Sequence, residues 1–433
     1  MMRSRNYILF QLFAILCFKQ IAFAQFTARD FDARDEKAER SLLIPYAFSS
    51  ESLEVAFGLA GGTGGYLQEQ MTTFAALLYS SNESGGVYLF LNQYQLPFAE
   101  RLFLSANFSL AHYTQYRTYV DGNPDYPDSR AGSNESNKDD FIEQNGYDRW
   151  ASLITEYVFP LGDSEDKPID EYILKRGLLV EGASGSGPFN PLKSGKTTAK
   201  LEWFWRSPGY DFDEFNDFYY TNGLKFQTTY DNTDFYTNPS TGSRVRAAIA
   251  RDFGMFNSTN TWTTLRADWS KYFSLGETED IRQQVLAFNV WTAYTPTWND
   301  DCTGPIEHRP PFEQGASLGG FYRMRGFADG RFIDKAAVYY GAEYRLIPDW
   351  NPTSDNRYLK FLDIDWFQLV GFGELGRVAD TWGLKEFHND MKWDAGFGIR
   401  GMFSKAVLRL DFAYSDEGVQ VWAMVGHPWV FAL

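Results

Sequence analysis

The sequence predicts an all-β fold, a transmembrane antiparallel β-barrel of about sixteen strands with a long loop folded into the lumen. Apolar and polar residues alternate with the two-residue period of β-strands from residue 51 almost to the end of the chain. The mean hydropathy of −0.38 is that of a soluble protein, yet aromatic residues make up 18% of the chain. A barrel reconciles these two values because only every second residue of a strand faces lipid.

The first 24 residues predict a signal peptide. Arg3 and Arg5 precede an apolar run from Tyr7 to Phe18, and Ala22-Phe23-Ala24 supplies small residues for cleavage before Gln25. No later segment is apolar over about eighteen residues, which excludes helical membrane spans. Cleavage removes three cations and leaves a protein more acidic than its formal charge of −16, which argues against nucleic acid as a partner.

Residues 25–50 are charged and too few for an ordinary domain, so they predict a short periplasmic segment with room for one short helix. The barrel is predicted over residues 51–433. Its strands are expected at residues 53–60, 71–80, 86–94, 102–113, 150–159, 173–180, 200–206, 223–230, 244–252, 261–272, 283–294, 337–346, 364–376, 395–403, 407–414 and 419–425.

These strands are recognised by alternation. In residues 53–60 the large apolar side chains all have odd numbers. In residues 200–206, Trp203 is expected to face outward, and Glu202 and Arg206 inward. Most of the expected strands are near the length of about 9–11 residues that a tilted strand needs to cross a bilayer.

The strand count predicts the topology. An even number of strands puts both ends of the barrel in the periplasm. Counted from residue 53, the 117–145 connection falls on the periplasmic side, and the longest loop is residues 299–335. Closure of the sheet removes the unpaired edges that lipid cannot satisfy.

The inward-facing residues of the later strands are charged with both signs. They are Arg244, Arg246, Arg266, Asp268, Glu343, Arg345, Glu374, Arg400, Arg409 and Asp411. A water-filled lumen tolerates such residues, and their mixed signs favour ladders of ion pairs between strands. One interpretation is a structural lining of the lumen. The other is that part of this set holds the long loop.

Four ordered motifs carry a family resemblance. Met324-Arg325-Gly326-Phe327 resembles a Val-Arg-Gly-Phe/Tyr loop motif, and Phe372-Gly373-Glu374-Leu375-Gly376 resembles a Phe-x-Asp-x-Gly strand motif with Glu in place of Asp. Tyr230 to Asp234, with Pro239 and Gly242, resembles a periplasmic turn, and Gly396 to Asp411 resembles a pair of final strands. Together they resemble the BamA/TamA-type outer-membrane assembly barrel superfamily, the bacterial surface antigen family.

The resemblance implies a loop-lock motif. In the family, the loop arginine pairs with the acidic residue of the strand motif, so Arg325, Gly326 and Phe327 are expected to meet Glu374. Glu343 is the alternative partner, because a guanidinium binds any suitably placed carboxylate through two hydrogen bonds. The chain departs from the family pattern in one respect, because residues 25–50 leave no room for periplasmic polypeptide-transport-associated domains.

The resemblance also implies a function. The barrel is expected in the outer membrane of a Gram-negative bacterium, where it would assist insertion or translocation of protein or lipid through a seam between its first and last strands. The expected seam residues are Leu53, Val55, Phe57, Gly58, Val421, Trp422 and Gly426. The glycines would weaken side-chain packing there, although glycines also mark ordinary turns and strand ends.

Two other function classes remain open, a loop-plugged channel or transporter and a structural, partner-bound barrel. The expected partners are outer-membrane lipid and either a separately encoded periplasmic protein or a second copy of the chain. No catalytic residue, cofactor or metal site is expected. The four histidines, His112, His308, His388 and His427, are far apart and show no serine and carboxylate at suggestive positions, and the acidic stretch Asp211 to Glu214 lacks the spacing of a calcium loop.

Overall fold

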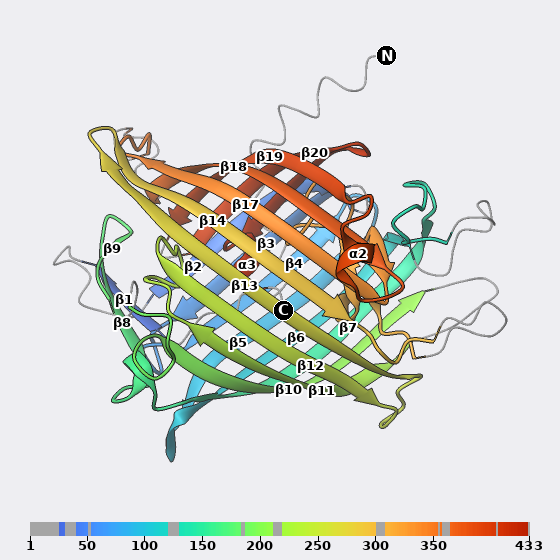
Figure 1. Cartoon of the computed structure of the whole chain (residues 1–433), viewed down its shortest axis with the longest axis horizontal. Helices are drawn as coiled ribbons and strands as arrows, with labels where there is room; N and C mark the ends of the chain where they lie inside the picture. Colours follow the sequence, from blue (N-terminus) through green and yellow to red (C-terminus); the bar gives the residue numbers. More distant parts are fainter. Residues whose placement is uncertain are drawn as a thin grey trace.

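The computed structural model describes residues 26–30, 40–50, 53–119, 130–182, 187–210, 219–299, 308–353, 356, 364–403 and 406–431. One antiparallel sheet of sixteen strands curls around a lumen, which confirms the predicted fold class (Figure 1). Its strands, in order, are β2 (Arg40–Ser50), β3 (Glu54–Gly64), β4 (Thr72–Ser80), β5 (Gly85–Leu96), β6 (Ala99–Thr118), β7 (Ile142–Val158), β10 (Lys196–Tyr210), β11 (Thr221–Asp231), β12 (Gly242–Phe253), β13 (Thr261–Thr278), β14 (Ile281–Tyr294), β17 (Ala336–Pro348), β18 (Ile364–Ala379), β19 (Lys392–Phe403), β20 (Ala406–Ser415) and β21 (Gly418–Val425). The predicted signal peptide lies outside the described residues.

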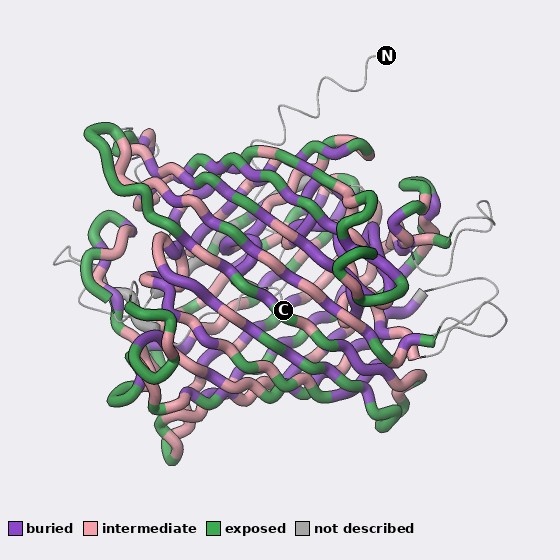
Figure 2. Tube along the Cα trace, in the orientation of Figure 1, coloured by how far each residue is buried: buried purple, intermediate pink, exposed green. Residues whose placement is uncertain are grey.

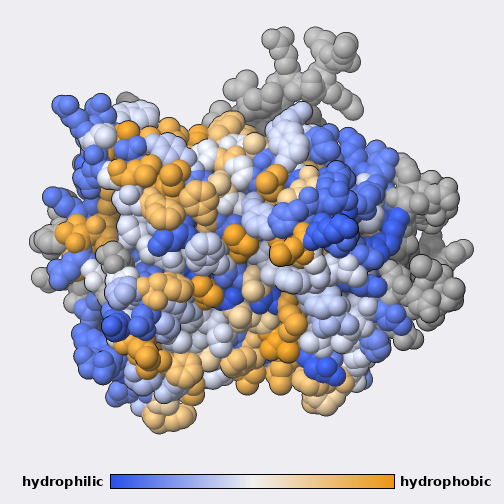
Figure 3. All heavy atoms as spheres, viewed as in Figure 1, coloured by the Kyte–Doolittle hydropathy of each residue, from blue (hydrophilic) through white to orange (hydrophobic). Residues whose placement is uncertain are grey.

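The outer surface of the sheet is apolar. Figure 2 shows buried and exposed residues alternating along the strands, and Figure 3 shows apolar side chains gathered over the barrel wall. Phe57, Leu89, Leu153, Trp269 and Phe397 are among the large apolar side chains that stand exposed on the strands. A protein surrounded by water would bury most such side chains, so this surface is suited to lipid. Within the described residues, no helix is both long and apolar enough to span a bilayer.

The sheet begins earlier than the sequence predicted. Its first strand is β2, within the 25–50 segment for which a short helix was expected. Pro45 interrupts the alternation of this segment, which hides the strand from a pattern-based prediction. Because β2 is the edge of the sheet and pairs only with β3 in the described residues, a proline without an N–H is tolerated there.

Residues 173–180 were predicted as a barrel strand, and this prediction is wrong. They belong to β8 (Asp170–Lys175) and β9 (Leu178–Glu181), which form a separate three-stranded sheet with β1 (Phe26–Asp30). A strand in a small packed sheet alternates as a barrel strand does, so the pattern could not separate them. The two errors offset each other, which is why the total of sixteen strands was correct.

The β1–β8–β9 sheet packs at the end of the barrel where β2 begins and β21 ends (Figure 1). We call this the terminal end. Tyr172 and Leu174 of β8 are buried against Trp366 and other residues of the barrel wall. The indole Nε1 of Trp366 donates a hydrogen bond to the carbonyl of Gly177 at 2.9 Å. Burial raises the pKa of Asp170 in this sheet, and the ammonium of Lys196 opposes that shift.

At the opposite end, which we call the loop end, two connections are joined by hydrogen bonds. Arg331 donates a hydrogen bond to the hydroxyl of Ser136 at 2.7 Å, and the amide of Ile333 donates one to the carbonyl of Gly132 at 2.7 Å. The 118–142 connection therefore lies at the same end as the 294–336 loop. The count from residue 53 omitted β2 and therefore put this connection at the other end of the barrel from the loop, which is wrong.

The turn between β11 and β12 is organised by side chains that replace backbone partners. The carboxylate of Asp231 accepts hydrogen bonds from the amide and hydroxyl of Thr233 at 2.9 and 2.7 Å. Asp234 accepts bonds from the amides of Ser240 and Thr241 at 2.8 and 3.1 Å. Such Asx-type bonds hold a tight turn in one conformation and explain the Tyr-Asp pattern in physical terms.

Candidate functional site in the barrel lumen

The loop between β14 and β17 lies inside the barrel. It is described from residue 308, and β15 (Ala316–Leu318) pairs with β16 (Phe332–Asp334) within it. Its apolar side chains share one buried cluster with inward-facing residues of the wall, which include Leu318, Met324, Phe327 and Phe332 on the loop side and Trp291, Tyr339 and Val378 on the wall side. Hydrophobic packing therefore fixes the loop in the lumen.

The backbone of the loop bends sharply on the way to Arg325. Gly319 and Gly320 have φ angles of 106° and 99°, and a Cβ on Gly319 would lie 2.2 Å from the carbonyl oxygen of Ala328. Met324 has a φ of 56°, which is uncommon for a side chain of its size. Its complete burial shows that the surrounding packing holds this conformation in place.

Arg325 is the charged centre of the loop, and its side chain is fully buried. Its Nε donates a hydrogen bond to Glu374 Oε1 at 3.1 Å, and its backbone amide donates one to Glu374 Oε2 at 2.7 Å. Its Nη1 lies 2.9 Å from Glu343 and 2.9 Å from Asp411. The guanidinium stacks 3.5 Å from the ring centre of Phe372, so its face is in contact as well as its Nε and Nη1 atoms.

The carboxylates around Arg325 also hold other guanidiniums. Glu343 accepts hydrogen bonds from Arg400 at 2.7 Å and from Arg345 at 2.8 Å. Asp411 accepts one from Arg409. We define the arginine–carboxylate cluster as Arg325, Arg345, Arg400, Arg409, Glu343, Glu374, Asp394 and Asp411, all of them buried. The guanidiniums and acidic side chains lie against one another, and this pairing of opposite charges lowers the cost of removing them from water.

The loop is also held by backbone contacts on either side of Gly326. The carbonyl of Arg325 accepts a hydrogen bond from the indole of Trp422 at 2.7 Å, and the carbonyl of Gly326 accepts one from Ser415 at 2.7 Å. A Cβ on Gly326 would lie 2.5 Å from Cβ of Asp394. Glycine is therefore required for the loop to approach β19 and β20 this closely.

The residues after β21 turn back into the lumen. Gly426 has a φ of 81°, and the side chains of His427 and Trp429 that follow are buried. The carbonyl of Trp429 accepts hydrogen bonds from Arg244 at 3.0 Å and Arg246 at 2.8 Å. We call residues 426–431, which include the short helix α3 (Pro428–Phe431), the C-terminal tail.

Tyr339 joins the tail to the arginine–carboxylate cluster. Its hydroxyl donates a hydrogen bond to Glu374 and accepts one from the indole of Trp429 at 2.9 Å. Gly341 makes room for this contact, because a Cβ there would lie 2.3 Å from the Tyr339 hydroxyl and 2.8 Å from the Trp429 ring. The loop and the tail thus share one continuous set of hydrogen bonds.

The two edges of the sheet come together without pairing. No ladder joins β2 to β21 in the described part of the chain. Val425 of β21 and Leu408 of β20 pack against the buried apolar cluster that contains Tyr46 of β2. Side chains therefore close the wall where backbone hydrogen bonds do not.

The structure brings together all five residues of the expected loop-lock motif. Arg325 contacts Glu374 and also Glu343, so the two alternatives are satisfied at once. Gly326 sits at the close approach to β19, and Phe327 is buried against Phe332 with ring centres 5.0 Å apart.

The expected seam residues lie only in part at the edges of the sheet. Val421 and Trp422 lie on the edge strand β21, and Gly426 ends it. Leu53 precedes β3, and Val55, Phe57 and Gly58 belong to it, one strand inside the edge, because β2 comes first. Gly58 does not weaken packing there. A Cβ on it would lie 2.1 Å from the ring of Tyr46, so the glycine accommodates a side chain that ties β2 to its neighbours.

Three residues that contact the loop-lock motif or the C-terminal tail were not assigned a role from the sequence. Asp411 was recognised as inward-facing, and the Arg409-x-Asp411 spacing within one strand face could have suggested it as a partner. Tyr339 and Trp429 gave no such signal, because their contacts join distant parts of the chain. In the described residues, no group of three or more His, Cys, Asp or Glu is placed to hold a metal ion. The acidic stretch Asp211 to Glu214 lies outside the described residues.

Comparison with known proteins gives a family match. Residues 92–422 match the model of the Omp85 superfamily domain. No curated protein sequence matches the chain.

Two solved structures are similar. BamA from Haemophilus ducreyi lacking POTRA domains 1–3 has 14% identity and a TM-score of 0.48, over 90% of this chain and 69% of that one. CdiB from Escherichia coli has 10% identity and a TM-score of 0.53, over 89% of this chain. The likeness to CdiB shows the fold, and the chain spans 61% of the length of that protein.

Proposed function

Because the chain belongs to the Omp85 superfamily, as an outer-membrane β-barrel of a Gram-negative bacterium, we propose that it assists the insertion or translocation of protein or lipid at the outer membrane. The proposed route is the seam between β2 and β21. This places the seam at the observed edges of the sheet and not at β3.

The single observation that carries the proposal is the pair of unpaired edges. β21 has 8 residues and ends at the Gly426 turn, whereas β2 has 11 residues. In lipid, each unsatisfied backbone group costs several kcal/mol, so an open edge is a high-energy site. Such an edge can be satisfied by an added strand, which is the general way that sheets recruit extended segments.

The arginine–carboxylate cluster supports a mechanism in which the loop positions the seam. Trp422 of β21 donates to the carbonyl of Arg325, and Ser415 at the end of β20 donates to the carbonyl of Gly326. The C-terminal tail is held in turn by Arg244 and Arg246 on the opposite part of the wall. The last two strands are therefore fastened inward, to the loop and across the lumen, while no described backbone ladder joins them to β2.

The proposal predicts a measurable effect on client folding. The purified barrel in liposomes should speed the folding of a urea-denatured outer-membrane barrel about tenfold or more over empty liposomes, because an available edge lowers the barrier to strand pairing. Folding is followed by the mobility shift of the client on unheated gels. Liposomes containing an unrelated closed barrel are the control, and equal rates with both barrels would refute the proposal.

A channel is the second candidate function, and the charged lumen lining favours it. The two candidates differ in conductance. Because the loop occupies the lumen, planar-bilayer recordings of the intact protein should show small, variable currents. Deletion of residues 315–334 should give larger and steadier currents, since it removes the apolar plug and Arg325. A large, stable pore in the intact protein would favour an ordinary channel and contradict the plugged lumen.

We propose no catalytic role. His112 lies against Tyr147 and His388 against Tyr340, both with tilted rings, and His427 lies against Arg400. The proposed partners are outer-membrane lipid and either a separate periplasmic protein or a second copy of the chain. The β1–β8–β9 sheet at the terminal end is the surface proposed for a periplasmic partner, because β1 and β9 are its two edges.

A further inference from the structure

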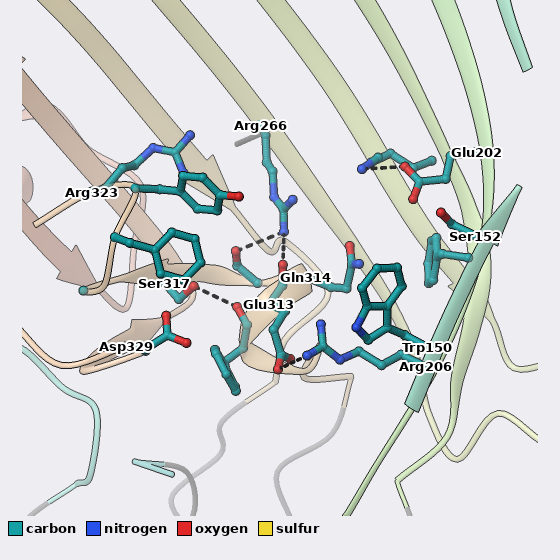
Figure 4. A pocket seen from close by; sticks show the side chains of 18 of the residues that line it. Trp150, Ser152, Glu202, Arg206, Arg266, Glu313, Gln314, Ser317, Arg323 and Asp329 are labelled. Atoms are coloured by element: carbon teal, nitrogen blue, oxygen red, sulfur yellow. Dashed lines mark hydrogen bonds and ion pairs between the residues drawn. The ribbon is translucent and has the colours of Figure 1, made fainter. Parts of the chain in front are cut away.

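A cavity lies beside the loop, away from the arginine–carboxylate cluster. Its volume is about 180 Å³, and its walls come from β7, β10, β11, β13, β14 and the loop itself. Figure 4 shows Trp150, Glu202, Arg206, Arg266 and Glu313 directed toward it. It plays no part in the proposed seam or in the contacts of Arg325.

Two of the cations at this cavity are neutralised by carboxylates. Arg206 donates to both oxygens of Asp148 at 2.8 Å and lies 2.6 Å from Glu313. Lys225 lies 2.7 Å from Glu202. These ion pairs form part of the wall and leave little capacity for a ligand.

Arg266 differs from both. Its Nη2 donates to the backbone carbonyls of Glu313 at 3.1 Å and Gly315 at 3.4 Å. In the described residues it forms no ion pair with a carboxylate, and its buried Nε has no hydrogen-bond partner. Arg266 is half-buried and its hydrogen bonds go to neutral carbonyls, and the carboxylate that acts on its charge, Glu202, is already paired with Lys225. The charge of the guanidinium is therefore only partly compensated.

A second guanidinium enters the cavity from the loop side. Arg323 extends from the loop and stacks 4.1 Å from the ring centre of Trp291. Trp150, Tyr322 and the carboxylate of Asp329 also line the space, so the walls combine charged groups of both signs with aromatic surface. An apolar cavity of about 150 Å³ is large enough for one benzene ring. The present cavity therefore has room for one ring with one charged group.

We propose that this cavity binds a small organic oxyanion with a planar apolar body, such as an aromatic carboxylate. Arg266 receives the anionic group with help from Arg323, and the ring lies against the aromatic wall. A carboxylate would supply the charge that Arg266 lacks and accept a bond from its unpartnered Nε. The site goes beyond the proposed function, because it requires neither an open seam nor a client.

Benzoate is the probe for this proposal, with saturation-transfer NMR on the detergent-solubilised full chain as the measurement. The expected dissociation constant is about 1 mM or below. Benzyl alcohol has the ring without the charge, and inorganic phosphate has the charge without the ring. Both should bind at least about tenfold more weakly than benzoate, and phosphate should not displace benzoate at equal concentration.

The variants Arg266→Gln and Arg323→Gln should each weaken benzoate binding by at least about tenfold. The matched control is Lys271→Gln, which removes a cation from the same strand outside the cavity and should bind as the wild type does. Heat-dependent gel mobility verifies that each variant is a folded barrel. Absence of benzoate binding to the wild type at about 10 mM, or equal binding by wild type and Arg266→Gln, would overturn the proposal. Displacement by an equal concentration of phosphate would overturn the organic ligand class.

Discussion

Replacing Arg325 with alanine is expected to release the loop from the lumen. The substitution leaves Glu374, Glu343 and Asp411 without one of their buried cations and removes the stack on Phe372. Removing one partner of a buried ion pair costs about 3–5 kcal/mol, because the remaining charges stay out of water without compensation. Arg325→Lys should recover only part of this loss, since an ammonium cannot form the same set of planar contacts.

Chymotrypsin reports this release directly. Phe321, Tyr322 and Phe327 are cleavage sites within the loop and are protected while it is packed in the lumen. Digestion should be rapid in Arg325→Ala and slow in the wild type. Arg251→Ala is the matched control, because Arg251 is an exposed arginine that bonds only to Thr263 in the described residues. Continued protection in Arg325→Ala would mean that the apolar cluster alone holds the loop.

A double-mutant cycle separates the contribution of the Arg325–Glu374 pair from the other contacts of Arg325. Glu374→Gln should also expose the loop, and the double substitution Arg325→Ala with Glu374→Gln should cost clearly less than the sum of the two. If the two effects simply add, Glu374 is not the main partner. Glu343 and Asp411 would then carry the attachment.

Replacing Glu343 with glutamine is expected to destabilise the barrel as a whole. Glu343 contacts Arg325, Arg345 and Arg400, so the substitution removes the one negative charge that these three guanidiniums share. The effect is largest at Arg345, because both of its terminal nitrogens already lack a hydrogen-bond partner in the described residues. The expected cost is again about 3–5 kcal/mol, but it falls on β17 and β19 of the wall and not only on the loop.

The temperature at which the folded barrel unfolds on gels measures this effect. It should fall in Glu343→Gln and recover in part when Arg345→Met is added, because the second change restores the charge balance. Glu277→Gln, at an exposed position near the end of β13, is the control and should not differ from the wild type. An unchanged unfolding temperature in Glu343→Gln would show that the lumen is wet enough to solvate these arginines.

Strands could be predicted from the sequence because their two-residue period is a local property. Long strands such as β13 and β18 keep this period. The loop around Arg325 could be recognised because its motif is one of four that occur in a fixed order along the chain. The same local rule explains why β2 was missed and why residues 173–180 were assigned to the barrel. Pro45 broke the period in β2, whereas residues 173–180 kept it in a sheet outside the barrel.

The rest of the site depends on contacts between distant residues. Trp429 meets Arg244 and Arg246 across more than 180 positions of sequence, and no spacing within the chain predicts such a contact. The sequence predicted several inward-facing carboxylates as possible partners of Arg325. It did not predict that three of them contact its guanidinium together. Gly58 was misjudged for the same reason, because its role depends on the Tyr46 ring of the neighbouring strand.

The central claim is that the seam between β2 and β21 must open for the protein to act, and a reversible disulfide across it is the direct test. In a Cys302→Ser background, Val425→Cys is combined with single cysteines at positions 43–47 of β2, and the pair that crosslinks most completely is chosen. The account predicts that liposomes with the oxidised variant lose the acceleration of client folding and that a reductant restores it. Oxidised and reduced variants that accelerate folding equally would contradict it.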